Sequence, residues 1–252
     1  MGRGEGGYTG ASPLWEGGGG NPYLPGAWQI QEVYDRAKKG EWGFDLASLS
    51  LGDAFEGGFF AGFISHTADG NPTHGLIVAP RATGATGSSY TLTTNLQWKT
   101  SNTTTADTTS PFDGAANTAA MVTAGIASHP AAEFCVDLTI DGYSDWYLPA
   151  RYELDIAYEN LKPTTTSNNT SWGINEYSVP ERTVNRTAGD PAQTSITAFQ
   201  STGSEPFVAA NLWSSAEDSA SNAWGLLFGS GLQFSGFKNL NDRVRAFRKF
   251  AL

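Results

Sequence analysis

The sequence predicts an α+β fold in which two helices pack with a small antiparallel sheet, preceded by a glycine-rich arm and a short helix. Glycine contributes 30 of 252 residues and only 16% of residues are charged, which disfavours a helical bundle. Two segments have helical apolar spacing, and strand and turn patterns occur before and after them. We therefore expect an arm with a short helix over residues 1–45 and one folded domain over residues 46–252.

The arm, residues 1–26, is rich in glycine and proline and has no apolar periodicity, as in a linker. Its aromatic residues, Tyr8, Trp15 and Tyr23, favour contact with a neighbouring subunit. Residues 27–40 have the spacing of an amphipathic helix that ends at a glycine. We expect this part of the chain to mediate attachment or oligomer contacts.

The folded domain is expected to begin with a β-hairpin. Residues 48–64 and 75–80 contain apolar strand patterns, joined through an Asp-Gly-Asn-Pro turn. His66 and His74 flank this turn, where two imidazoles could bind a metal ion. No cysteine or acidic cluster lies between them beyond the aspartate of the turn, so we favour solvated loop histidines and assign no metal site.

The first predicted helix of the domain spans residues 113–129. Asp113 precedes the apolar spacing and is a candidate N-cap, because its carboxylate can accept a hydrogen bond from a free backbone N–H group. The expected inner face consists of Ala119, Val122, Thr123 and Ile126. The apolar run that follows contains Cys135, the only cysteine, which we interpret as a buried thiol rather than a nucleophile.

The second predicted helix spans residues 150–161, after Pro149 and before Pro163. Its apolar stripe consists of Leu154, Tyr158 and Leu161. Residues 163–203 are polar and irregular, which is typical of an insertion that carries surface loops.

The C-terminal block contains an apolar strand over residues 222–228, followed by residues rich in glycine, serine and asparagine, where we expect a bend. Leu232, Phe234 and Phe237 are unusual in a bend, because a turn does not need large apolar side chains. They either form a local core or are displayed to a partner.

The closing segment alternates apolar and basic residues, as in a half-buried strand. Arg243, Arg245 and Arg248 could form an anion site. Alternating arginines on a strand more often pair with carboxylates, such as Asp145 or Glu153, and we favour that structural role.

Aromatic motifs recur in two blocks. They are GYSDWYLP at residues 142–149 followed by EL at 153–154, then WSS at 213–215, NAW at 222–224 and VRAFR at 244–248. In this order the motifs resemble the signature of the Lcl C-terminal-like domain family, over residues 111–252. That family is found in bacterial surface proteins and phage structural proteins. The resemblance implies a C-type-lectin-like fold.

The same C-terminal segment resembles the variable regions made by diversity-generating retroelements. In such regions asparagine codons are rewritten at their adenines, which yields residues such as Asn, Ser, Gly, Asp, Leu and Phe. The candidate rewritten positions are Gly225, Leu227, Gly229, Ser230, Leu232, Phe234, Ser235, Gly236, Phe237, Asn239, Leu240, Asn241 and Asp242. Trp224, Gln233 and Lys238 would then be invariant. An ordinary loop rich in glycine, serine and asparagine is the alternative interpretation.

Charge and composition exclude several functional classes. The net charge of −10 opposes binding to phosphate backbones, so no nucleic-acid partner is expected. No run approaches the roughly 20 apolar residues that cross a bilayer, so no membrane insertion is expected. The first residues lack the apolar core of a secretory signal, which favours export within a virion.

No catalytic motif is recognisable, and we expect no enzymatic activity: the sequence has no G-x-S-x-G, H-E-x-x-H or P-loop pattern. Glu217 and Asp218 could ligate Ca²⁺ together with backbone carbonyls. The Glu-Pro-Asn or Gln-Pro-Asp loop typical of calcium-dependent lectins is missing from the sequence, so no cofactor is assigned.

These features predict a phage virion protein, at a tail-fibre tip, a collar or a capsid surface, that binds a host-surface glycan or protein. The alternative is an adhesin domain on a bacterial cell surface. We expect a homotrimer, because weak single sites gain from multivalency, and other virion proteins as partners of the arm. The predicted ligand-binding residues are Trp213, Asn222, Gly225, Leu227, Ser230, Leu232, Phe234, Ser235, Phe237, Asn239 and Asn241.

Overall fold

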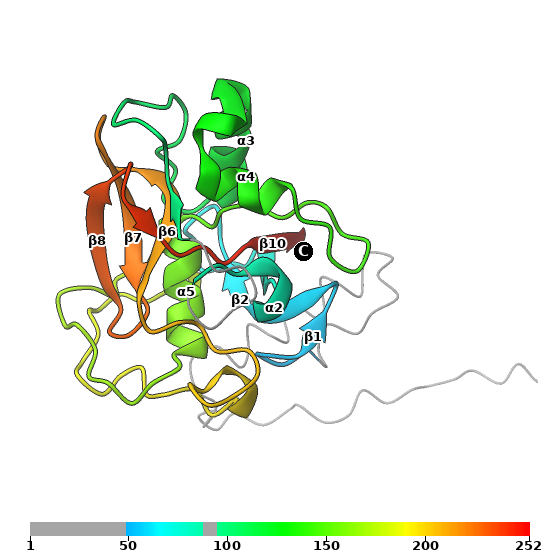
Figure 1. Cartoon of the computed structure of the whole chain (residues 1–252). Helices are drawn as coiled ribbons and strands as arrows, with labels where there is room; N and C mark the ends of the chain where they lie inside the picture. The colour runs from blue at the N-terminus through cyan, green and yellow to red at the C-terminus, as the bar shows by residue number, and fades with distance from the viewer. Residues whose placement is uncertain (1–48, 88–94) are drawn as a thin grey trace, which may run out of the picture.

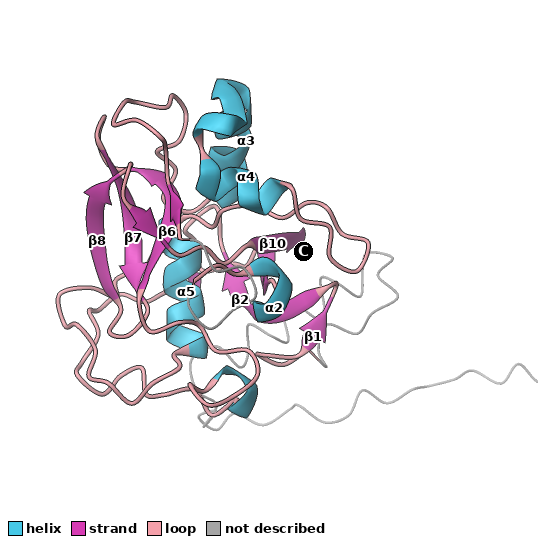
Figure 2. Cartoon of the chain, viewed as in Figure 1, coloured by secondary structure: helices cyan, strands magenta, loops and turns pink. Residues whose placement is uncertain are grey.

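The computed structural model describes residues 49–87 and 95–252, and its fold is α+β, as predicted (Figure 1). The expected arm and the helix over residues 27–40 lie outside the described residues. Within this described part of the chain, three antiparallel sheets pack with two longer helices and several short ones (Figure 2). Within the described segments, no helix has the length and apolar character needed to cross a membrane.

The first sheet contains the predicted hairpin and the closing strand. Its strands are β1 (Ala54–Phe55), β2 (Gly58–Ile64), β3 (His74–Val78), β10 (Phe247–Ala251) and β5 (Ser178–Val179). The order is β1-β2-β3-β10, and β5 also pairs with β2. β2 and β3 pair antiparallel across the turn, so the predicted hairpin is confirmed. Phe247 of β10 lies opposite Val78 of β3, which joins distant parts of the chain.

The second sheet contains β6 (Asn211–Glu217), β7 (Asn222–Leu227) and β8 (Leu232–Phe237), and a third joins β4 (Leu96–Gln97) to β9 (Asn241–Asp242). The expectation of an irregular bend after β7 was wrong over β8. Each residue of β8 has a partner in β7, with Leu227 opposite Leu232 and Asn222 opposite Phe237. Cross-strand pairing and partial burial thus outweigh the turn propensity of its glycine and serine residues.

Helix α5 (Arg151–Leu161) lies between the first and second sheets (Figure 1). Its predicted stripe, Leu154, Tyr158 and Leu161, is buried, which confirms that face. These side chains share one apolar cluster with Ile64 of β2 and Leu226 of β7. The helix therefore fixes both sheets to one core.

Helix α3 (Gly114–Gly125) begins where the sequence predicted but buries a different face from the predicted one. Asp113 accepts a hydrogen bond from the N–H of Ala116 at 3.0 Å, which confirms the N-cap. The predicted inner face was wrong for Ala119, Val122 and Thr123, which are exposed, whereas Ile126 packs against the core. The buried residues are Gly114, Asn117, Thr118 and Met121.

Polar contacts explain this orientation of α3. The amide of Asn117 donates to the hydroxyl of Ser215 at 3.1 Å, and the hydroxyl of Thr118 accepts from the N–H of Leu148 at 3.1 Å. The helix ends at Gly125, whose φ of 110° is outside the helical region. A 3-10 turn, η2 (Ile126–Ser128), and a separate helix, α4 (Pro130–Val136), follow, so one helix to residue 129 was too long.

The predicted insertion, residues 163–203, is irregular but is not only surface. Its one helical turn is η3 (Thr197–Phe199), and the side chains of Arg186 and Phe199 are buried. The insertion therefore contributes to the core beside α5.

A further short helix, α2 (Arg81–Gly84), follows β3.

Candidate binding surface

Buried polar side chains hold the β7–β8 hairpin in place. Lys238, directly after β8, is fully buried and its Nζ donates to Glu217 Oε2 at 2.6 Å and to the carbonyl of Thr103 at 2.9 Å. Burial lowers the pKa of Lys238, and Glu217 offsets part of this effect. The end of β8 is thus tied to β6 and to the loop after β4.

A second polar network fixes the other end of the hairpin. Gln233 is buried and donates to Asp155 Oδ1 of α5 at 2.9 Å. Arg186 also binds Asp155, at 2.5 Å, and donates to the carbonyl of Gly231 in the β7–β8 turn at 2.9 Å. Burial opposes the charge of Arg186, but the nearby carboxylates outweigh it and raise its pKa. The hairpin is therefore a rigid support.

The predicted ligand-binding residues differ in solvent exposure, and some of them are buried. Ser235, Phe237, Asn239 and Asn241 are exposed, whereas Asn222, Leu227, Ser230, Leu232 and Phe234 are partly buried. Trp213 and Gly225 are buried, so their predicted place in the ligand-binding surface was wrong. The Trp213 indole donates to the carbonyl of Leu96 at 2.9 Å and contacts the Phe234 ring, so it belongs to the core.

Gly225 has no room for a side chain. A Cβ atom there would lie 2.4 Å from Cζ of Phe234 and 2.6 Å from the carbonyl oxygen of Leu212. The second contact is with backbone, which cannot move aside as a side chain can. The geometry therefore requires glycine at this candidate rewritten position.

The exposed residues at the end of β8 form a patch, which we call the hairpin patch. It consists of Ser235, Phe237, Asn239, Leu240 and Asn241. Phe237 is 54% exposed and Leu240 is 52% exposed, and the N–H of Leu240 donates to the carbonyl of Phe237 at 3.0 Å. Two large apolar side chains therefore face solvent at one tight turn, among polar neighbours.

An aromatic cluster around Arg151 lies beside this patch, and we call it the arginine site. The guanidinium carbon of Arg151 is 3.9 Å from the ring centroid of Trp224 in β7, and 5.1 Å from that of Trp172. Tyr152 lies at 5.4 Å, and the two indoles meet edge to face. Arg151 Nε donates to Gln233 Oε1, which orients the guanidinium.

Three polar side chains border the arginine site, and we call them the polar rim. Ser235 donates its hydroxyl to Asp218 Oδ2 at 2.6 Å and accepts from the amide of Asn222 at 3.1 Å. Asn222 Oδ1 is buried and has no hydrogen-bond partner among the described residues. Ser235 belongs to both the rim and the hairpin patch, so the two surfaces are continuous.

The sequence analysis did not identify Arg151 or Trp172 as site residues. One signal for Arg151 is present: it is the first residue of α5, where a helix favours acidic rather than basic side chains. Trp172 had no comparable signal, because it lies in the irregular insertion.

A scan against protein-family models finds no match to this chain, and a search of the curated proteins finds no significant match.

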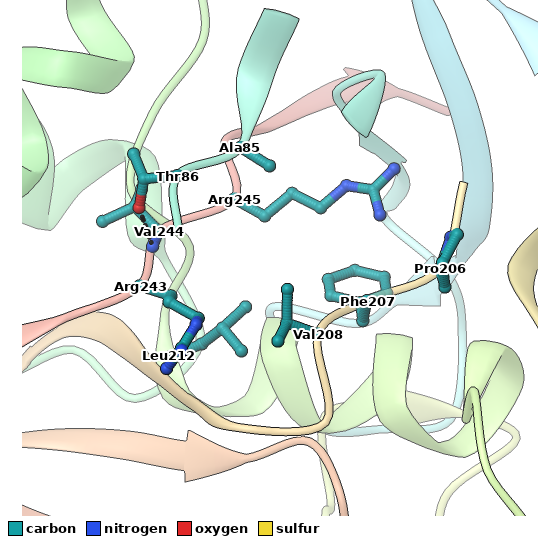
Figure 3. A pocket seen from close by; sticks show the side chains of 9 residues that line it. All are labelled: Ala85, Thr86, Pro206, Phe207, Val208, Leu212, Arg243, Val244 and Arg245. Carbon is teal, nitrogen blue, oxygen red and sulfur yellow. Dashed lines mark hydrogen bonds between the residues drawn. The ribbon is translucent and has the colours of Figure 1, made fainter. Parts of the chain in front are cut away.

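The closing arginines do not form a shared anion site. Arg245 donates to Glu205 Oε2 at 3.1 Å, and Arg248 donates to both oxygens of Asp145. Figure 3 shows Arg245 extending toward Phe207 while Arg243 points toward Leu212. The predicted structural role is confirmed for Arg245 and Arg248, with Asp145 but not Glu153 as a partner.

The two histidines considered as metal ligands differ from the solvated loop histidines that the sequence predicted. His66 and His74 are partly buried rather than solvated, and their rings lie 4.4 Å apart. Burial, with help from Lys249, lowers the pKa of His66 to about 4. No cluster of three potential metal ligands occurs among the described residues. Glu217 is bound to Lys238 and Asp218 to Ser235, as described above.

Cys135 is buried, and burial raises the pKa of its thiol well above the ordinary value. Its Sγ donates to the carbonyl of Ala131 in α4. The interpretation as a buried thiol is confirmed.

Proposed function

We propose that this chain is a phage virion protein that binds a host-surface receptor or glycan through the hairpin patch. In this proposal the described residues form a C-type-lectin-like domain of the Lcl C-terminal-like family, the arm attaches it to other virion proteins, and the assembly is a homotrimer. The chain has no catalytic role in this proposal.

The observation that carries the proposal is the exposure of Phe237 and Leu240 on an anchored hairpin. Large apolar side chains on a rigid support bind a partner without a large loss of conformational entropy. Asn239 and Asn241 add adaptable hydrogen-bonding groups on the same turn. Gln233 and Lys238 hold the backbone beneath, and both are buried.

The test is binding of the labelled protein to a panel of bacterial strains. Replacing both apolar side chains, Phe237→Ser with Leu240→Ser, should weaken binding about tenfold or more, because it removes the apolar contact area. Leu51→Ser with Val122→Ser is the matched control, since these side chains are 37% and 48% exposed elsewhere on the molecule. Equal binding by the folded patch variant and the wild type would refute the proposal.

The genomic neighbourhood separates the virion protein from the bacterial adhesin. Adjacent capsid or tail genes support the first, and surface-protein genes without phage genes support the second.

A further inference from the structure

Arg151 forms no ion pair with the described residues, although Asp155 and Asp218 lie near enough to favour its charged form. Arg182, Arg186, Arg245 and Arg248 all form ion pairs with carboxylates. Arg151 forms none with the described residues, and only its Nε has a hydrogen bond there. Its two terminal amino groups therefore remain available as donors.

The position of Arg151 is unfavourable for the fold itself. As the first residue of α5 it lies at the positive end of the helix, where a cation is disfavoured. It is also partly buried, and burial lowers its pKa. A partly buried cation without an ion pair is a candidate partner for an external anion.

The geometry of Arg151 suits a carboxylate. Stacking on Trp224 and the bond to Gln233 hold the guanidinium in one plane, which prepares its remaining donors for bidentate pairing. The two nearby carboxylates have other partners, Arg186 for Asp155 and Ser235 for Asp218, and neither forms an ion pair with Arg151. Salt screens charges farther away than about 8 Å, so the nearby Asp155 and Asp218 oppose a bound anion more than the distant part of the net charge of −10 does.

We infer that the arginine site binds a carboxylate-bearing sugar, such as a uronic or sialic acid residue, in an acidic surface glycan. The partly exposed indole of Trp172 offers apolar surface to the C–H face of a sugar ring. The exposed hydroxyl of Ser235, in the polar rim, is a candidate partner for a sugar hydroxyl. An acidic peptide could use the contact between its carboxylate and Arg151, but it has no sugar ring to place on the aromatic surface. This inference rests on the proposed function and names the ligand class beside the hairpin patch.

The experiment measures binding of the full chain to matched glycan pairs by calorimetry or on an array. The probes are sialyllactose with lactose, and trigalacturonate with its carboxyl-reduced form. We expect at least one acidic probe to bind about tenfold or more tightly than its neutral partner, as expected for a charge-assisted bidentate contact. A glutamate hexapeptide should bind more weakly than that acidic probe.

Variants assign the effect to the site. Arg151→Gln should abolish the preference for the acidic probe, and Arg151→Lys should retain only part of it, because lysine lacks the planar fork. Trp172→Leu should weaken acidic and neutral probes together. Should Arg151→Gln fail to fold, the lysine variant and competition by free galacturonate against galactose provide the same comparison.

Equal affinity for acidic and neutral probes, or no binding to any acidic probe, overturns the inference. Equal or tighter binding of the glutamate peptide overturns the sugar class. The proposed function is judged separately by the Phe237 and Leu240 variant on cells. Cell binding that depends on the hairpin patch but is unaffected by Arg151→Gln would leave that function intact and refute this inference.

Discussion

Burial controls the chemistry of Glu153, in the first turn of α5. Its Oε2 accepts from the N–H of Ala150 at 2.7 Å, and the hydroxyl of Tyr147 donates to its Oε1 at 2.9 Å. Desolvation nevertheless dominates and raises its pKa from 4.5 to about 7. The folded state therefore binds this proton more tightly than the unfolded state does.

This raised pKa predicts a pH-dependent stability. The contribution of protonated Glu153 is fully present below pH 4.5 and is lost as the pH rises through about 7. Glu153→Gln mimics the protonated form, so its stability relative to the wild type should increase over this window by on the order of 3 kcal/mol. Urea unfolding of both proteins from pH 4.5 to 8 checks this.

The difference in the free energy of unfolding between the two proteins cancels the contributions of other titrating groups. One of these is His66, whose lowered pKa changes stability with pH in the opposite direction. A difference in stability that stays constant between pH 4.5 and 8 would show that Glu153 has an ordinary pKa.

At the level of single elements, Asp113 links the start of α3 to β10. It caps the helix and also accepts from Lys249 Nζ at 2.7 Å. Asp113→Ala removes both contacts and should lower the free energy of unfolding by about 1 kcal/mol for the cap, with a further contribution from the ion pair. Asp113→Asn keeps the cap and should lose less than about 1 kcal/mol.

Chemical denaturation of the two variants separates these contributions. The asparagine variant being as unstable as the alanine variant would mean that the ion pair, not the cap, holds this helix end.

Helix α5 was predictable because Leu154, Tyr158 and Leu161 repeat at helical spacing and are all buried. The inner face of α3 was not, because its buried Asn117 and Thr118 are satisfied by partners distant in the sequence. Buried polar residues such as these leave no apolar periodicity in the sequence, so the buried face of the helix could not be predicted from it.

The same reasoning applies to the candidate site. Phe237 stood out as an aromatic residue among turn formers, and it is exposed. The arginine site depends on contacts from Arg151 to Trp224 and Gln233, on a hairpin far along the chain. Only the tertiary structure brings these residues together. Trp213 was misassigned because composition alone does not show that β4 covers its indole.

For the whole molecule, the pairing of β10 with β3 predicts one cooperative unfolding transition. Phe247 is fully buried, and its backbone also pairs with Tyr147. Phe247→Ala should lower the free energy of unfolding by about 3–5 kcal/mol, because it leaves a cavity between α5 and the sheets. Tryptophan fluorescence and far-ultraviolet circular dichroism should give the same midpoint.

The matched control is Phe237→Ala, at the exposed hairpin patch, which should change stability by no more than about 0.5 kcal/mol. Separate midpoints for the two signals in the Phe247 variant would show that the sheets unfold independently.

The alternation of buried and exposed residues along the hairpin has a practical consequence for protein engineering. Buried positions of the hairpin include Gly225, Gln233 and Lys238. The neighbouring side chains of the hairpin patch are exposed. A combinatorial library that randomises the patch and keeps those three residues should yield mostly well-folded members. The domain is thus a natural starting framework for selecting new affinity reagents.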